Sequence, residues 1–179
     1  MGEKVILVDR KDRQVGMGEK LETHLKGRLH RALSIFVFNS KGELMLQRRA
    51  LGKYHCGGLW SNTVCSHPRP GEKIGKAVHR RLKEELGFDT PLHEVFSFIY
   101  RVKFANGLTE YEFDHFFFGR FDGKPKPNPK EVCDWKWINL KDLRKDVNAH
   151  PKKYTYWFMK ALPRFKKYLG KSAPQRSKV

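Results

Sequence analysis

The stretch LWSNTVCSHPRPGEKIGKAVHRRLKEELGF, Leu59 to Phe88, joins a short β-rich run to a helical one. Its second half predicts a helix, since apolar side chains recur at helical spacing and a glycine follows as a stop signal. These residues are Ala77, Val78, Leu82, Leu86 and Gly87. Arginines and glutamates four residues apart share the helix surface and predict ion pairs between successive turns: Arg80 with Glu84, and Arg81 with Glu85.

The first half of the stretch contains a thiol and an imidazole two residues apart, Cys65 and His67. If TVCSH is extended, both side chains point to the same face of the strand, because side chains alternate with period two. Such a pair can be a nucleophile with its base, two metal ligands, or a catalytic thiol beside a metal ligand. A buried thiol next to a surface histidine is the simpler alternative.

The whole stretch resembles a Nudix box, G-x5-E-x7-R-E-U-x-E-E-x-G-U, in which U is aliphatic or aromatic. Aligned on its end, the box runs from Ser66 to Phe88. The matching residues are Glu72, Arg80, Leu82, Glu84, Glu85, Gly87 and Phe88. Ser66 stands at the first glycine, and Arg81 replaces a glutamate that holds metal in Nudix hydrolases. This replacement argues against ordinary diphosphate hydrolysis.

Further motifs narrow the resemblance to one family. They are RRAL at Arg48–Leu51, the pattern W-[ST]-N-x-V-C-x-H-P at Trp60–Pro68, RRLKEELG, and YEF around Glu112. Together they resemble the type I isopentenyl-diphosphate isomerases over roughly residues 3 to 160. The resemblance implies the Nudix fold, an α/β or α+β sandwich in which helices flank a mixed β-sheet.

Composition and local pattern agree with one globular domain. The 179 residues are 39% hydrophobic and 13% aromatic, which is typical of a chain with a packed core. We expect a single domain over residues 1–170 and a disordered basic tail over 171–179. The expected strands are 4–9, 32–39, 43–49, 95–104, 108–121 and 132–140, with hairpins at 40–42 and 105–107 and a loop at 53–58. Helices are expected at 140–147 and 150–170, the second kinked or restarted at Pro163.

The formal charge is +18, and residues 141–179 hold twelve Lys and Arg against two Asp. A basic protein attracts anions, which include diphosphates, nucleic acids and membrane surfaces. No RNA-binding module accompanies the charge, so we expect a small-molecule substrate, no specific nucleic acid and no membrane partner. The assembly is expected to be a monomer or a homodimer.

Three cysteines, Cys56, Cys65 and Cys133, are an odd number without the spacing of a metal site. Free thiols fit a reducing compartment, so a cytoplasmic location is expected. The longest apolar runs are too short to cross a bilayer, and the N-terminus lacks a signal-peptide pattern.

Glu110 and Glu112 alternate with Tyr111, so both carboxylates share one face of the predicted strand. Like charges on one face repel unless they are solvated or bound to a cation. Taken alone, the pair fits a solvated strand face, and His24 or His30 fits a surface or capping residue. The family resemblance implies a zinc or manganese site instead, with ligands His24, His30, His67, Glu110 and Glu112.

The resemblance also implies a Mg²⁺ ion that bridges Glu85, the Cys65 backbone carbonyl and the substrate diphosphate. Oxygen ligands of this kind are those that Mg²⁺ prefers. The positions that match the family's diphosphate-binding residues are Lys20, Arg49, Lys53, Ser66 and Arg81. Solvated surface is the alternative for each basic side chain.

The reaction implied is a 1,3-allylic proton shift between isopentenyl and dimethylallyl diphosphate through a tertiary carbocation. We expect Glu112 to be the acid, tuned by the metal and Tyr100, and Cys65 to be the base. The opposite assignment stays open because the reaction is reversible. Trp157 is expected to stabilise the cation with its π face, with a core aromatic as the alternative. Two other functions compete with the isomerase: a Nudix hydrolase and a nucleic-acid-binding protein.

Overall fold

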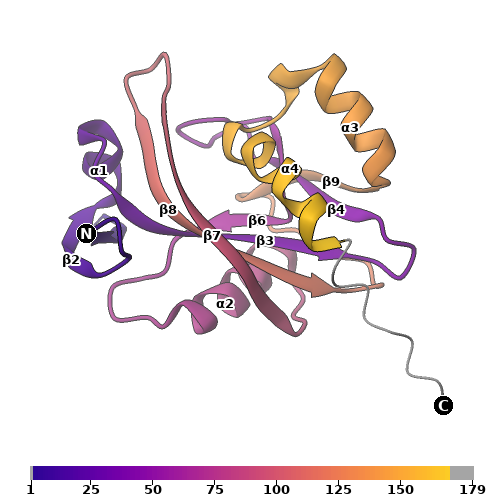
Figure 1. The fold of residues 1–179 in the computed structure, drawn as a ribbon, viewed down its shortest axis with the longest axis horizontal. Helices are drawn as coiled ribbons and strands as arrows, with labels where there is room; N and C mark the ends of the chain where they lie inside the picture. Colours follow the sequence, from indigo (N-terminus) through magenta and orange to yellow (C-terminus); the bar gives the residue numbers. More distant parts are fainter. Residues whose placement is uncertain (1, 170–179) are drawn as a thin grey trace.

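The computed structural model describes residues 2–169, in which nine strands form one sheet and four α-helices pack around it (Figure 1). The strands are β1 (Lys4–Val8), β2 (Gln14–Glu19), β3 (His30–Phe38), β4 (Leu44–Arg49), β5 (Trp60–Ser61), β6 (Val64–Ser66), β7 (Leu92–Lys103), β8 (Thr109–Arg120) and β9 (Val132–Ile138). The helices are α1 (Lys20–Lys26), α2 (Ile74–Leu86), α3 (Leu140–Ala149) and α4 (Tyr156–Leu169), with a 3₁₀ turn at Pro151–Lys153.

Strand β3 is the centre of the sheet, and its apolar run is buried on both faces. It pairs in parallel with β8 and antiparallel with β6. Leu33, Ile35 and Val37 belong to the core beneath α2, whereas Phe36 and Phe38 belong to the core beneath α3 and α4. A strand covered on both faces reads as a continuous apolar run, as IFVF does here.

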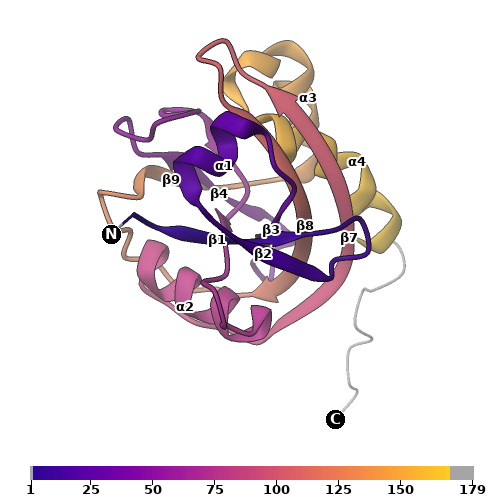
Figure 2. The same ribbon diagram turned by 90° about the vertical axis from the view of Figure 1, so that its left-hand side faces the viewer.

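The two helical layers lie on opposite faces of the sheet, α2 on one and α3 with α4 on the other (Figures 1 and 2). Helix α2 buries Ala77, Val78, Leu82 and Leu86 against the sheet. Fully burying one such large apolar side chain is worth about 1.5–3 kcal/mol. The expected sandwich with a mixed sheet between helices is therefore confirmed.

The predicted hairpin at residues 105–107 is confirmed, because β7 and β8 pair antiparallel along their whole lengths. The hairpin at 40–42 is confirmed only beside its turn, where Phe38 pairs with Leu44. Beyond that pair the strands separate, since β4 pairs with β9 and β5 while β3 pairs with β8 and β6. The separation leaves room for β6, which carries Cys65.

Strand β2 and helix α1 were not expected from the sequence. The Glu19 side chain caps α1 by accepting from the Glu22 amide at 2.7 Å, and Gly27 ends the helix with a φ of 57°. The helix has only two turns, too few for a clear apolar period. It nevertheless fixes His24, whose side chain is buried.

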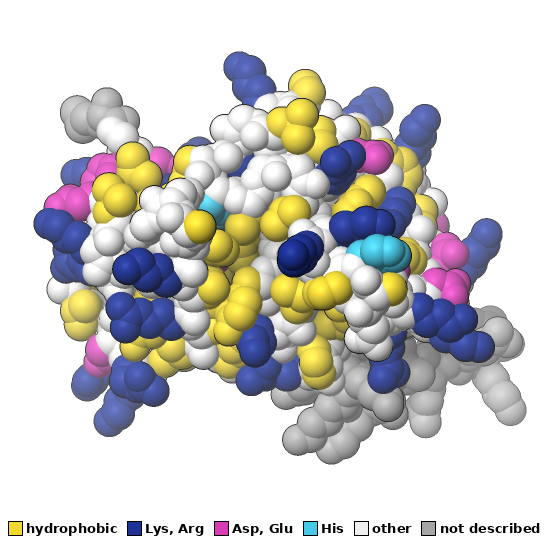
Figure 3. Space-filling view, turned by 90° about the horizontal axis from the view of Figure 1, so that it is seen from above, with side chains coloured by type: hydrophobic (Ala, Val, Ile, Leu, Met, Phe, Trp, Pro, Cys, Tyr) yellow, Lys and Arg dark blue, Asp and Glu magenta, His cyan; other side chains and the backbone are white. Residues whose placement is uncertain are grey.

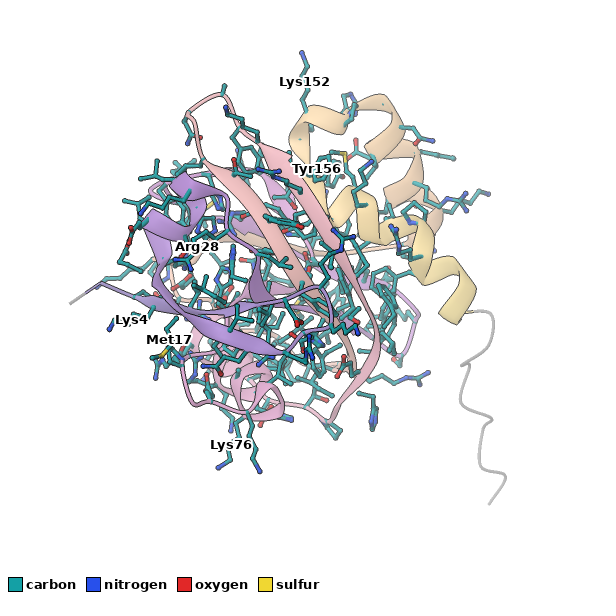
Figure 4. The ribbon with its side chains drawn as sticks, turned by 60° about the vertical axis from the view of Figure 1, so that its left-hand side comes forward. Lys4, Met17, Arg28, Lys76, Lys152 and Tyr156 are labelled. Carbon is teal, nitrogen blue, oxygen red and sulfur yellow. The ribbon has the colours of Figure 1, made fainter. Side chains whose placement is uncertain are left out.

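Basic side chains are spread over the described surface. Figure 3 shows Lys and Arg across one face, and Figure 4 shows Lys76 on α2 and Lys152 in the 3₁₀ turn pointing away from opposite sides of the domain. Within residues 2–169, helices that are both long and apolar enough to cross a membrane are absent. The expected tail at 171–179 lies outside the described residues.

Two glycines that flank α2 have a positive φ, a backbone conformation that residues with a side chain rarely adopt. Gly71 and Gly87 have φ values of 78° and 71°, but a Cβ would meet nothing at Gly71 and would lie 2.7 Å from the Lys126 carbonyl oxygen at Gly87. Gly71→Ala should lower the free energy of unfolding by about 1–2 kcal/mol through backbone strain. Gly87→Ala should cost about 1–3 kcal/mol more because of the clash. Urea denaturation measures both, and equal losses would contradict the clash.

Candidate active site

One pocket collects side chains from α1, α2, α4, β3, β4, β6, β7, β8 and the loop before β5. Most of the residues singled out in the sequence line it: Lys20, Arg49, Lys53, Cys65, Ser66, His67, Arg81, Tyr100, Glu110, Glu112 and Trp157. His24, His30 and Glu85 are buried beside these residues. The structure thus brings the selected side chains together, although they are scattered along the chain.

Three imidazoles converge on Glu112. The parallel register of β3 and β8 sets His30 opposite Glu112, and His30 Nε2 lies 3.5 Å from Glu112 Oε1. His67 follows β6 and places Nε2 2.9 Å from the same oxygen. His24 completes the group from α1, with its ring centroid 4.8 Å from that of His30. Ligand atoms of these four buried residues all lie within 4.8 Å of one another.

The ring nitrogens of two histidines are oriented for a cation. His24 Nδ1 donates to the Lys20 carbonyl at 2.7 Å, and His30 Nδ1 donates to the Arg28 carbonyl at 2.8 Å. Each Nε2 is therefore left with a lone pair, and each is buried without a hydrogen-bond partner among the described residues. Metal-bound histidines are fixed by backbone carbonyls in this way. The donor set fits a divalent metal ion.

The protonation states of His24 and His67 also suit metal binding. Burial lowers the pKa of His24, although the Lys20 carbonyl and the two glutamates oppose the shift. Burial also lowers the pKa of His67 to about 3, against the contact with Glu112. Neutral imidazoles are the form that binds a metal. The resulting His and Glu group can hold a metal ion.

Tyr100 links the two carboxylates on β8. Its hydroxyl oxygen lies 2.7 Å from Glu110 Oε2 and 2.5 Å from Glu112 Oε2. These contacts confirm that Glu110 and Glu112 face the same way. A single phenolic proton can bond to one carboxyl group at a time, so the hydroxyl is shared between the two. The hydroxyl is thus placed to hold or pass a proton between them.

Cys65 and His67 both line the pocket, as does Ser66 between them. Arg49 Nη1 donates to Cys65 Sγ at 3.3 Å, and Ser61 Oγ lies 3.8 Å away. Desolvation in the pocket raises the pKa of the Cys65 thiol to about 11, although Arg49 and Ser61 oppose the shift. The resting side chain is therefore a thiol that keeps its proton at neutral pH.

Trp157 is both a core residue and part of the pocket wall. It lies on α4 and is buried with Phe158 and Phe165 of the same helix, yet it also lines the pocket. Its indole Nε1 donates to Ser61 Oγ at 3.0 Å, and the Arg49 guanidinium lies 5.3 Å from the ring centroid. The ring is thus fixed beside Cys65.

At one end of the pocket, the basic side chains of Arg81 and Lys53 form ion pairs with glutamates. Arg81 binds Glu84 and Glu85, both at 2.7 Å, and Glu131 at 3.3 Å. Lys53 forms a close ion pair with Glu131 as well. The Arg81–Glu85 pair is confirmed, but it is not a solvated surface pair, since only 2% of Glu85 is exposed. Burial raises the pKa of Glu85 against the effect of Arg81.

A model of the NUDIX domain matches residues 28–158. Over 164 residues the chain is 56% identical to "Isopentenyl-diphosphate Delta-isomerase 2" of Aromatoleum aromaticum, covering 92% of this chain and 87% of that protein. It is 54% identical to the protein of the same description from Photorhabdus laumondii, covering 90% and 92%. The chain belongs to the isopentenyl-diphosphate Delta-isomerases of the Nudix family.

Solved structures agree with this isomerase at the level of the fold. DR0079 from Deinococcus radiodurans superimposes with a TM-score of 0.70 at 24% identity, covering 82% of this chain and 90% of that one. The NUDIX domain of Shewanella oneidensis NrtR, solved with ADP ribose, gives a TM-score of 0.61 at 15% identity, covering 79% and 87%. At these identities the similarity concerns the backbone and not the chemistry.

Two glutamates of the Nudix box serve the isomerase as structural ion-pair partners. Glu72 accepts two bonds from Arg80, both at 2.7 Å, and also accepts from the Arg69 amide at 2.9 Å. Glu84 pairs with Arg80 at 2.9 Å and with Arg81. A bidentate pair of this kind fixes the loop before α2 against the helix.

Sequence reasoning missed two residues of the site. His55 lines the pocket in the loop before β5, and its Nε2 lies 2.7 Å from Glu110 Oε1. Glu131 precedes β9 and joins the two basic residues Lys53 and Arg81. Neither belongs to a motif, and both reach the site through turns. The only local signal was the cluster of ring-bearing residues at Tyr54 and His55.

The raised pKa of Cys65 predicts slow alkylation. Iodoacetamide reacts with the thiolate, whose fraction rises about tenfold per pH unit below the pKa. Exposed Cys133 should therefore react first at pH 8, and labelling of Cys65 should still be accelerating at pH 10. Peptide mass spectrometry follows both sites in one sample. A Cys65 rate that levels off below pH 9 would contradict the raised pKa.

Proposed function

We propose that this isomerase interconverts isopentenyl diphosphate and dimethylallyl diphosphate through a 1,3-allylic proton shift that uses Cys65 and Glu112. The observation that carries the proposal is one pocket lined by a thiol, a carboxylate that contacts a phenol, and a fixed indole ring. The names and 44–56% identities of the relatives support the same activity.

The chemistry needs an acid and a base in a site without water. A proton added to the terminal methylene of isopentenyl diphosphate leaves a tertiary carbocation, and removal of a proton from C2 gives dimethylallyl diphosphate. An alkene is a weak base, so the acid must be held in place. Glu112 is our candidate acid and Cys65 our candidate base, with Tyr100 as the group that positions the proton on Glu112.

The reverse assignment has an observation in its favour. The Cys65 thiol keeps its proton because its pKa is raised to about 11. Burial raises the pKa of Glu112, but its contacts with His30 and His67 hold it well below the ordinary value. This resting distribution suits Cys65 as donor and Glu112 as acceptor. Either way, each turnover exchanges the two protonation states, so both groups are required.

The cation site of the proposed mechanism comprises His24, His30, His67, Glu110 and Glu112. Zinc or manganese suits such a mixed set of imidazoles and carboxylates. A bound ion supplies positive charge that makes a proton on Glu112 more acidic. Without the ion, His67 and Tyr100 still hold Glu112 in one orientation at the pocket wall.

The diphosphate end of the proposed mechanism comprises Lys20, Arg49, Lys53, Ser66 and Arg81. Arginine suits phosphate because its planar fork donates two parallel bonds. Glu85 and the Cys65 carbonyl would hold Mg²⁺, which would neutralise part of the charge of the diphosphate. Glu85 fits the role because it is buried and already fixed by Gln47 Nε2 at 3.1 Å.

The activity is tested by incubating the protein with isopentenyl diphosphate, Mg²⁺ and Zn²⁺ in D₂O. Dimethylallyl diphosphate carrying deuterium should form without release of phosphate. Cys65→Ala should reduce kcat by more than tenfold, since a proton-transfer group contributes at least about 1.4 kcal/mol. Substrate Kd should change little. NMR measures both the product and its label.

Two outcomes would count against this proposal. Phosphate release with no isomer would indicate a Nudix hydrolase. A Cys65→Ala variant with more than about a tenth of wild-type kcat would show that the thiol is not essential. Cys133→Ala serves as the matched control, because this exposed thiol lies outside the pocket.

Trp157 should stabilise the carbocation through its π face. A desolvated cation–π contact is worth about 2 kcal/mol, or roughly 30-fold in rate when it acts only on the charged state. Trp157→Phe keeps an aromatic face and should lose a few-fold in kcat, while Trp157→Leu should lose much more with little change in substrate Kd. Equal kcat values in the two folded variants would assign Trp157 to packing alone.

A further inference from the structure

His55 is a buried imidazole at the pocket that the proposed mechanism leaves without a role. Only 7% of the residue is exposed. Its Nε2 lies 2.7 Å from Glu110 Oε1, and its ring centroid lies 5.7 Å from that of His24. A side chain buried this deeply beside a carboxylate and a second imidazole needs a partner that satisfies its ring nitrogens.

The contact with Glu110 does not supply that partner. The two atoms are close enough for a hydrogen bond, yet both ring nitrogens of His55 lack one within the described part of the chain. His24 Nε2 is buried without a partner as well. Ligand atoms of His24, His55 and Glu110 all lie within 4.8 Å of one another. Close approach without hydrogen-bond geometry is what atoms directed at a shared cation show.

The loop that presents His55 is built to hold it. Cys56 has a φ of 52°, which is strained for a residue with a side chain, and a Cβ on Gly57 would lie 2.6 Å from the Leu51 carbonyl oxygen. Asn106 Nδ2 donates to the Tyr54 carbonyl at 3.2 Å, and Arg49 Nη2 donates to the His55 carbonyl at 3.4 Å. Backbone strain of this kind persists where the surroundings fix one conformation.

We propose that His55 is a further ligand of the metal centre, on the side of His24 and Glu110. The inference rests on the proposed His and Glu centre and adds a fourth imidazole to it. A set richer in imidazole favours borderline ions such as Zn²⁺ or Co²⁺ over Mg²⁺. Binding also occupies a ring lone pair of His55 in a pocket where a carbocation forms and a free imidazole is a nucleophile.

Metal binding tests the proposal without an activity assay. Protein stripped with a chelator is titrated with Co²⁺, whose visible absorption reports on the ligands. His55→Ala should bind Co²⁺ at least tenfold more weakly than wild type and should change the absorption spectrum. Free imidazole should restore both properties by filling the vacated position. His55→Gln, which keeps a polar side chain of similar length, gives the same answer if the alanine variant does not fold.

Two control variants separate the loss of a metal ligand from the general effect of removing a buried imidazole. His115→Ala removes another largely buried imidazole with carboxylate contacts, to Glu94 and Asp12, but His115 lies outside the two candidate metal groups of the described residues. It should bind Co²⁺ like wild type. His24→Ala should lose most of the affinity, because His24 belongs to both groups.

The outcomes test the role of His55 separately from the existence of the metal centre. Wild type that does not bind Co²⁺ would overturn the metal centre and His55 with it. If His24→Ala loses Co²⁺ while the His55 variants keep wild-type affinity and spectrum, the inference about His55 alone fails. Weaker binding with an unchanged spectrum would make His55 a residue that only positions Glu110, and that outcome also overturns its role as a ligand.

Discussion

Two carboxylates on β8, Glu110 and Glu112, must be compensated inside the protein, and this constraint organises the site. Only 3% and 6% of these residues are exposed. A buried charge is tolerated only when it is paired or hydrogen-bonded. The sheet supplies the partners through its register: β7 sets Tyr100 opposite Glu112 from one side, and β3 sets His30 opposite it from the other.

Asp114 and Phe116 continue the same face of β8 beyond Glu112. Asp114 follows Glu112 on that face and accepts from Ser34 Oγ at 2.9 Å. Burial and the nearby Glu112 raise the pKa of Asp114 well above its ordinary value, although the Ser34 hydrogen bond opposes the shift. Beyond it lies Phe116 in the apolar core. The strand thus passes from the two carboxyl groups of the site to one whose burial favours its neutral form and then to aromatic packing.

Local patterns predicted most of the elements and their faces, but not β2, α1 or the pairing between distant strands. Alternation placed Glu110 and Glu112 on one face, and helical spacing with Gly87 placed α2, because these signals depend on neighbouring residues. The parallel pairing of β3 with β8 joins residues that are distant in the sequence, so it left no local signal. His55 escaped prediction for the same reason, since a strained turn sets its direction. The family resemblance, and not any pattern, selected His24 and His30.

The charge balance at the other end of the pocket gives a physical reason for a second cation there. Arg81 and Lys53 are the proposed diphosphate ligands, yet Glu85 and Glu131 already pair with them. An incoming diphosphate would meet two carboxylates within the same shell of basic groups, and like charges at close range are unfavourable in a poorly solvated site. In the proposed mechanism, a divalent ion held by Glu85 would offset that repulsion. The Glu85–Arg81 pair would then fix the carboxylate proposed to bind the ion, while Glu131 holds the side chains of Lys53 and Arg81.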